Sequence, residues 1–205
     1  MKKAISVMVA AAMVLALFSG PVYAGHGNGN DRDKSSEFKD MKGHWGSQSV
    51  EKMQYWGILN GYDDGTFQPD RTLTQGELAV IIAKLLDAKQ GKQNDNYGNK
   101  KDLDEAALSK VPYWAKDAVS KGFMKHYLNT KRFHSQAQCD RITACVAIAK
   151  ALDLEPVTDF TKNPFKDMGM ISDEDFGYLL ALYKEGYISG YPNGNFYPYS
   201  FLSRA

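Results

Sequence analysis

Apolar residues recur at helical spacing in a stretch that begins near residue 74. Five of them fall at i, i+3, i+4, i+7 and i+8, the pattern of one helix face: Leu78, Ile81, Ile82, Leu85 and Leu86. Just before this stripe, Thr74-x-x-Glu77 has the spacing of a capping box, in which each side chain bonds the other residue's backbone N–H. The pattern predicts a helix that begins at Thr74 and buries one side.

A shorter helix is predicted upstream of this one. Val50, Met53 and Trp56 are spaced three residues apart and share one helix face. Gly57 follows directly and is suited to end the helix. The residues between the two helices, GYDDGTFQPD, are dense in turn formers. Residues 38–88 therefore predict a helix–loop–helix unit.

This unit recurs later in the chain. The opening FKDM of residues 38–41 returns at 165–168, and DGTFQP at 64–69 returns as NGNFYP at 193–198. A more degenerate middle unit spans 102–154, where Asp140 takes the capping position and Phe133 aligns with Phe67. Its apolar stripe consists of Ala144, Ala147, Ile148, Ala151 and Leu152. A unit this small cannot bury its stripe alone, so we expect the stripes to pack together.

The middle unit is shorter than the first. Four residues fewer separate Val119 from the Gly122-Phe123 pair than separate Val50 from Gly57. Four residues are about one helical turn, which predicts that the first helix of the middle unit is shortened by a turn.

The remaining segments are polar or carry an export signal. Residues 1–24 have two N-terminal lysines, an apolar run, and Val22 and Ala24 at the −3 and −1 positions of a cleavage site. They predict a secretory signal peptide rather than a membrane anchor, because the apolar run is short for spanning a bilayer. Residues 25–37 predict a disordered lead-in, and residues 89–101 and 155–164 predict linkers.

Charge and cysteine content exclude several classes of site. Without the leader the chain has 23 basic and 24 acidic residues, so no global basic field favours nucleic acid. If Cys139 and Cys145 lie on one helix, about 9 Å of rise separates them, beyond the roughly 7 Å that a disulfide spans. We expect two free thiols, with Cys145 semi-buried. The histidines and cysteines lack metal-ligand spacing, so we expect neither metal nor cofactor.

The three units resemble the S-layer homology family. That family has an F-x-D opening, a helix with a tryptophan, a G-I-I-x-G-Y-x-D-G-x-F-x-P loop, and T-R-A-E at the start of the second helix. The first unit matches nearly throughout, the third strongly, and the middle one mainly in its second half. The resemblance implies an all-α fold of helix–loop–helix repeats, arranged as three prongs with pseudo-threefold symmetry around a central helical bundle.

The resemblance also implies a function. Such proteins bind secondary cell-wall polysaccharide on peptidoglycan, often a pyruvylated glycan, in the grooves between prongs. We therefore expect a non-enzymatic, secreted protein that is anchored in the cell wall or S-layer of a Gram-positive bacterium, without nucleic acid as a partner and without membrane contact after signal cleavage. The resemblance implies that the arginine of T-R-A-E contacts the ligand. We predict a binding set of Arg141, Arg204, Gln75, Trp45, Asp40, Gly61, Asp167 and Gly190.

The chain departs from the family at each T-R-A-E position. Gln75 replaces the arginine in the first unit, whereas Arg141 retains it in the second. The third unit reaches Ser203-Arg204-Ala205, so its second helix is absent from this sequence. We expect an incomplete third prong, or a fragment of a longer protein.

Simple electrostatics also favours an anion site at these helix starts. Arg141 and Arg204 each follow a capping residue, where unpaired N–H groups and the helix dipole attract negative charge. A guanidinium there adds a fork of donors for a carboxylate, and Trp45, Trp114, Tyr62 and Tyr191 could supply flat surfaces for sugar rings. Arg141→Ala is predicted to weaken binding to wall polysaccharide. Other interpretations are that Trp45 and Trp114 are core residues and that Asp40 and Asp167 only cap the next turn.

Two alternative functions remain open from the sequence. The acidic clusters Asp63-Asp64 and Asp102–Glu105 are the nearest approach to a glycosidase pair, but both lie in a turn or linker context. The chain could still be the N-terminal anchor of a larger exported enzyme such as a glycoside hydrolase. It could also be a protein–protein interaction module, since helical repeats commonly bind partners.

Overall fold

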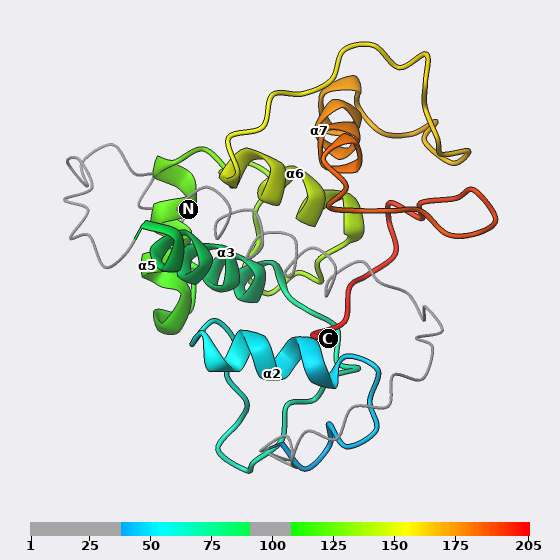
Figure 1. The fold of residues 1–205 in the computed structure, drawn as a ribbon. Helices are drawn as coiled ribbons and strands as arrows, with labels where there is room; N and C mark the ends of the chain where they lie inside the picture. Colours follow the sequence, from blue (N-terminus) through cyan, green and yellow to red (C-terminus); the bar gives the residue numbers. More distant parts are fainter. Residues whose placement is uncertain (1–37, 91–107) are drawn as a thin grey trace.

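A computed structural model describes residues 38–90 and 108–205 of the chain (Figure 1). In these two ranges the protein forms α-helices, one 3-10 turn and isolated backbone bridges, without a strand, which confirms the all-α prediction there. The predicted signal peptide at 1–24 and lead-in at 25–37 lie outside the described residues. So does most of the predicted linker at 89–101.

The first repeat forms the two predicted helices, α2 (Ser47–Tyr55) and α3 (Gln75–Gln90). Helix α2 ends as predicted, because Gly57 adopts a positive φ of 70° just after the last turn. Val50 and Met53 are buried, but Trp56 is 40 % exposed and does not extend the apolar face. Helix α3 continues two residues into the predicted linker.

The capping box at the start of α3 is confirmed. The Glu77 backbone N–H donates to Thr74 Oγ1 at 3.2 Å, and the Thr74 backbone N–H donates to Glu77 Oε2 at 2.9 Å. All five residues of the predicted stripe are at most 8 % exposed. The local pattern therefore fixes both where the helix begins and which side it buries.

The second repeat contains a 3-10 turn η2 (Tyr113–Ala115), α5 (Lys116–Met124) and α6 (Arg141–Ala151). The prediction of a shortened first helix is wrong, because α5 and α2 both have nine residues. Gly122 lies inside α5, and His126, with φ of 59°, takes the role of Gly57. The missing residues lie in the following loop: three residues fewer separate His126 from Phe133 than Gly57 from Phe67. The hydrogen bond from the Thr143 N–H to Asp140 Oδ1, 2.8 Å, confirms the predicted cap of α6.

The third repeat contributes α7 (Asp173–Lys184), capped by Ser172. The predicted linker at 155–164 packs against this helix: the Val157 N–H donates to the Gly177 carbonyl at 3.0 Å, and the rings of Phe160 and Phe176 lie 4.9 Å apart. This segment is therefore part of the packed structure.

Three backbone hydrogen bonds join the repeats in a closed ring. The Leu73 N–H donates to the Leu202 carbonyl at 2.8 Å, and the Leu202 N–H donates to the Cys139 carbonyl at 2.9 Å. The Cys139 N–H closes the cycle by donating to the Leu73 carbonyl at 2.8 Å. All three residues are at most 5 % exposed and each directly precedes the capping position of its repeat. The ring holds the starts of α3 and α6 against residues 203–205 of the third repeat.

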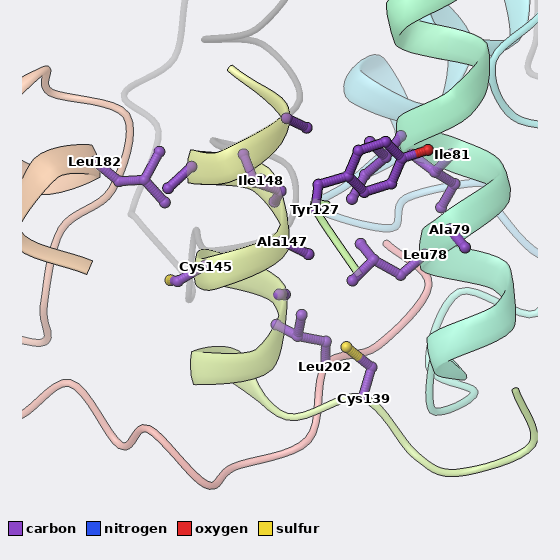
Figure 2. Close-up of a cluster of buried hydrophobic side chains, with 14 of the residues drawn as sticks. Leu78, Ala79, Ile81, Tyr127, Cys139, Cys145, Ala147, Ile148, Leu182 and Leu202 are labelled. Atoms are coloured by element: carbon purple, nitrogen blue, oxygen red, sulfur yellow. The ribbon is translucent and has the colours of Figure 1, made fainter. Parts of the chain in front are cut away.

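The main core surrounds this ring. Helix α6 packs against α7 on one side and α3 on the other, and α3 also packs against α5. Figure 2 shows Leu78 and Ile81 of α3 facing Ala147 and Ile148 of α6, with Leu182 of α7 beyond them. The predicted packing of the two stripes against each other is confirmed.

Both cysteines are free and fully buried (Figure 2). The prediction of free thiols is confirmed, although Cys145 is buried completely rather than partly. Burial raises the pKa of the Cys139 thiol to about 12 and that of Cys145 further. Neither thiol is therefore an effective nucleophile in the folded chain.

Candidate functional site

Each T-R-A-E-type residue lies against the loop of the next repeat. Arg141 of the second repeat contacts the loop of the third, and Arg204 of the third contacts the loop of the first. Gln75 of the first repeat contacts the loop of the second. The predicted residues are therefore brought to three equivalent junctions between repeats.

Arg141 is enclosed by its junction. Its Nε donates to the Phe196 carbonyl at 2.9 Å, and its guanidinium carbon lies 4.3 Å and 5.2 Å from the ring centres of Phe196 and Tyr191. The residue is only 4 % exposed, and this burial lowers the pKa of its guanidinium. Arg141 therefore holds the loop by stacking and hydrogen bonding.

Arg204 makes an analogous contact that includes a carboxylate. Its Nε donates to the Phe67 carbonyl at 3.0 Å, and its guanidinium stacks on Tyr62 and Phe67. Its Nη1 lies 2.9 Å from Glu77 Oε1, an oxygen that also pairs with Arg71. Burial alone would raise the pKa of Glu77, but the Thr74 N–H and the two arginines lower it overall.

Gln75 accepts a hydrogen bond from the loop of the next repeat, whereas Arg141 and Arg204 each donate one. Its Oε1 accepts a hydrogen bond from the His134 N–H at 3.0 Å. In the first repeat Asp40 accepts the equivalent N–H of Gln68, and in the third Asp167 accepts that of Tyr197. In the second repeat, the amide oxygen of Gln75 therefore accepts the hydrogen bond that a carboxylate oxygen accepts in the other two repeats.

The expectation that the helix starts present unpaired N–H groups is wrong. The Gln75 and Gly76 N–H groups donate to carbonyls of Ala137 and Ser135 at 2.9 and 3.0 Å. The corresponding N–H groups of the second repeat also donate, Arg141 to the Ser200 carbonyl and Ile142 to the Pro198 carbonyl. In the third repeat, Arg204 donates to the Arg71 carbonyl and Ala205 to the Pro69 carbonyl. These amides bind the neighbouring repeat and are unavailable to a ligand anion.

Asp40 and Asp167 organise the loops of their own repeats. Asp40 accepts from the Phe67 and Gln68 N–H groups at 2.8 and 2.7 Å, and Asp167 accepts from Phe196 and Tyr197 at the same distances. The alternative that they cap the next turn is therefore wrong, since these partners lie 27 to 30 residues away. Desolvation by itself would raise the pKa of Asp40, but the hydrogen bonds from the two N–H groups outweigh it, so the pKa is lowered overall.

Gly61 and Gly190 allow an aromatic ring to lie against the loop. A Cβ at Gly61 would be 2.0 Å from Phe38 Cε1, and one at Gly190 would be 2.8 Å from Phe165 Cε1. These rings belong to the F-x-D openings of the same repeats. The two glycines are thus required for packing of the opening segment on its loop.

The tryptophans lie at the surface. Trp45 is 51 % exposed and Trp114 is 55 % exposed, so the interpretation that they form the core is wrong. The Trp45 ring centre lies 5.3 Å from that of His44. Of the two tyrosines considered for sugar stacking, Tyr62 is 37 % exposed and Tyr191 is half-buried under Arg141.

A cavity of about 500 Å³ lies between the second and third repeats. Its walls come from the loop at 127–133, the start and one face of α6, and the start of α7. Aromatic and amide groups are contributed by Tyr127, Phe133, Tyr199, Gln75 and Asn129, and charged groups by Arg132, Asp140, Lys150, Glu174 and Asp175. Aromatic rings beside amides and charges are the groups that bind sugars through stacking and hydrogen bonds.

Of the eight binding residues predicted from the sequence, only Gln75 lines this cavity. Arg132 occupies the variable position before Phe133, and Lys150 lies between stripe residues of α6, so neither belongs to a repeat motif. Glu174 and Asp175 lie in the acidic first turn of α7, which is typical of any helix start. Only the packing of α7 beside α6 brings these groups together.

The described residues offer little basis for other chemistry. In residues 38–90 and 108–205, no three histidine, cysteine or acidic side chains are grouped to hold a metal ion. Within the same ranges, no helix has both the length and the apolarity to cross a membrane. Asp64 is engaged in a local turn, where its Oδ1 accepts from the Thr66 hydroxyl at 2.7 Å and from the Thr66 N–H. Asp102–Glu105 lies outside the described residues.

Comparison with known proteins finds the S-layer homology domain twice. A family model with that description matches residues 37–79 and 164–205. Cell surface glycoprotein 1 of Acetivibrio thermocellus is 33 % identical over 74 % of this chain, and the Cellulosome-anchoring protein of the same organism is 30 % identical over 72 %. Exoglucanase XynX, also from Acetivibrio thermocellus, is 23 % identical over 84 %. The matched region covers only 7 %, 33 % and 16 % of these relatives, respectively.

Proposed function

The chain belongs to the S-layer homology family through residues 37–79 and 164–205, and from this premise we propose that it anchors an exported protein to the bacterial cell wall by binding secondary wall polysaccharide. The observation that carries the proposal is the cavity between the second and third repeats. It combines three aromatic rings with amide and charged side chains in a volume that suits one or two sugar rings. The protein itself is proposed to be non-catalytic.

The names of two relatives support the same role. One is a Cellulosome-anchoring protein and another a Cell surface glycoprotein, and both align with this chain over more than two thirds of its length. The alignment with an exoglucanase covers 16 % of that protein, which is consistent with a module that attaches larger proteins of different activities. A secreted, wall-bound location in a Gram-positive bacterium and a pyruvylated glycan are part of the proposal.

The ring of hydrogen bonds through Leu73, Cys139 and Leu202 supports the proposed pseudo-threefold arrangement of three prongs around a bundle. Within it, we assign the eight predicted residues to two roles. Gln75 lines the cavity and contacts the ligand, and Trp45 offers a second exposed aromatic surface. Arg141, Arg204, Asp40, Asp167, Gly61 and Gly190 position the loops between which the glycan lies.

A cell-wall pull-down tests this function. The secreted chain should sediment with purified wall and lose this association when the polysaccharide is chemically extracted. Tyr199→Ala, which removes an aromatic ring from the cavity, should weaken the association by about tenfold, the worth of one good aromatic stacking contact. Tyr113→Ala is the matched control, because Tyr113 is 93 % exposed and lies outside the cavity lining. Equal retention on extracted wall would instead favour a protein partner.

A further inference from the structure

We propose that Arg132 and Lys150 are the charged contacts of the cavity between the second and third repeats for a carboxylate-bearing sugar, and that Asp175 and Glu174 set its affinity by competing for them. This inference rests on the proposed function and specifies the charge selectivity of the same site. It concerns residues outside the repeat motifs.

Two ion pairs connect the repeats at the cavity. Arg132 Nη1 lies 2.9 Å from Asp175 Oδ2, and Lys150 Nζ lies 3.1 Å from Glu174 Oε1. All four residues line the cavity. In each pair the cation belongs to the second repeat and the carboxylate to the first turn of α7 in the third. The cations are therefore oriented by protein carboxylates when no ligand is bound.

The charge balance of the lining has a direct consequence for an acidic ligand. With Asp140 included, the charged residues that line the cavity are two cations and three carboxylates. If both ion pairs stayed in place, a ligand carboxylate that entered the cavity would meet net negative charge. It gains a favourable contact only by taking a cation from Asp175 or Glu174.

Such an exchange is feasible at these positions. The Arg132 side chain is 68 % exposed and that of Glu174 is 65 % exposed, so both can rotate without unpacking the core. The other partner of each pair is less exposed, Asp175 at 18 % and Lys150 at 26 %. Because the exposed partner keeps each pair in contact with solvent, the pair contributes little net free energy, and a ligand carboxylate can take the place of the protein carboxylate. Lys150 also lies 4.9 Å from the Tyr178 ring centre, which can hold its ammonium group while Glu174 moves away.

The buried arginines are less suited to this role. Arg141 is 4 % exposed, and the Arg204 side chain is 11 % exposed and paired with Glu77. A ligand would have to open a loop junction to reach either one. Arg132 and Lys150 are reached from the cavity itself, so the geometry favours them as the contacts for charge.

The test compares charge variants of the full chain. Binding would be measured by calorimetry with a methyl glycoside carrying a pyruvate ketal and with the same glycoside after the ketal is removed. Asp175→Asn and Glu174→Gln should each tighten binding of the acidic glycoside about threefold to fivefold, since each removes a competing partner worth up to about 1 kcal/mol. Arg132→Gln and Lys150→Met should each weaken it about tenfold. The neutral glycoside should be nearly unaffected by all four.

Asp173→Asn is the matched control. It removes one negative charge from the same helical turn, but Asp173 lies outside the cavity lining. If it tightened binding as much as Asp175→Asn, a general field effect would explain the data and the specific competition would be wrong. Weaker binding in Asp175→Asn and Glu174→Gln would show that these carboxylates contact the sugar themselves, which also overturns the inference.

The outcomes separate this inference from the proposed function. If the wild type binds polysaccharide and the four cavity variants bind with the same affinity, the anchoring function stands, but the proposed charge contacts are wrong. Absence of wild-type binding to both wall polysaccharide and glycosides would overturn both. Thermal unfolding of each variant would show that changes in binding are not caused by loss of the fold.

Discussion

Arg204 Nη1 lies 2.9 Å from Glu77 Oε1, although 127 positions separate the two residues in the chain. Glu77 thereby joins the first repeat to the third, while its other oxygen completes the capping box of α3 with Thr74. One side chain therefore serves a local and a long-range interaction at once.

We predict that Glu77→Gln destabilises the fold by about 2 kcal/mol at pH 7. A glutamine retains the geometry of the capping box, but two partly buried arginines lose their anionic partner. Urea unfolding measures the effect, with the exposed Glu185→Gln as control. An unchanged midpoint would show that the arginines find other partners.

The same residue predicts an acid dependence. Since the pKa of Glu77 is lowered in the folded chain, its stabilisation is fully present above the pKa of the unfolded chain, about 4.5. It is lost as the pH falls through the lower folded pKa. The difference in unfolding free energy between wild type and Glu77→Gln should therefore shrink from pH 5 to about pH 2. A constant difference would contradict this assignment.

Arg141→Ala is expected to reduce stability, not only binding. The substitution removes the buried hydrogen bond to the Phe196 carbonyl and the stacking on two rings, at a cost of about 2–3 kcal/mol. Arg132→Ala, with an exposed side chain, should cost under about 1 kcal/mol. Thermal unfolding of the two variants distinguishes them. If Arg141→Ala lost binding at unchanged stability, Arg141 would be a direct ligand contact.

The two loop glycines should tolerate alanine poorly. At Gly190 the new Cβ would lie 2.8 Å from Phe165 Cε1 and 2.9 Å from the Asn195 carbonyl oxygen, which predicts a loss of about 2 kcal/mol. Gly169→Ala is the control within the same repeat, because nothing lies within 4 Å of its added Cβ. Chemical denaturation of both variants tests the contrast, and equal midpoints would contradict it.

The thiols are predicted to be inert in the folded protein. Cys139 and Cys145 are fully buried, and burial raises the pKa of Cys139 to about 12. At pH 8 a thiol-specific reagent should label neither residue in buffer and both in urea above the unfolding midpoint. Rapid labelling of folded protein would show that the core around the hydrogen-bonded ring opens readily.

Local signals in the sequence predict the helices well. Thr74 and Glu77, the five-residue stripe that follows, and Asp140 all act within one or two turns, so spacing alone places them correctly. The length of α5 was mispredicted because Gly122 resembles a helix end, whereas tertiary packing keeps it inside the helix. The actual shortening lies in a loop, where no periodicity marks it.

The site was less predictable because its groups come from different repeats. Sequence reasoning selected Arg141, Arg204 and Gln75, which the structure brings to the junctions between repeats, but it treated the first-turn amides beside them as available. The loop carbonyls that occupy those amides lie about 60 or more residues away in sequence, so no local pattern reveals them. Arg132 and Asp175, 43 positions apart, are likewise related only by the packing of α6 against α7.

The ring through Leu73, Cys139 and Leu202 uses one donor and one acceptor from every member, so none is left over for a fourth. Open solenoids can gain or lose a repeat at either end and change stability in steps. Within residues 38–90 and 108–205, the three hydrogen bonds instead form a circuit that closes on itself after three repeats. Duplication of a repeat would have to add a whole new circuit, and removal of one would break the circuit for the other two.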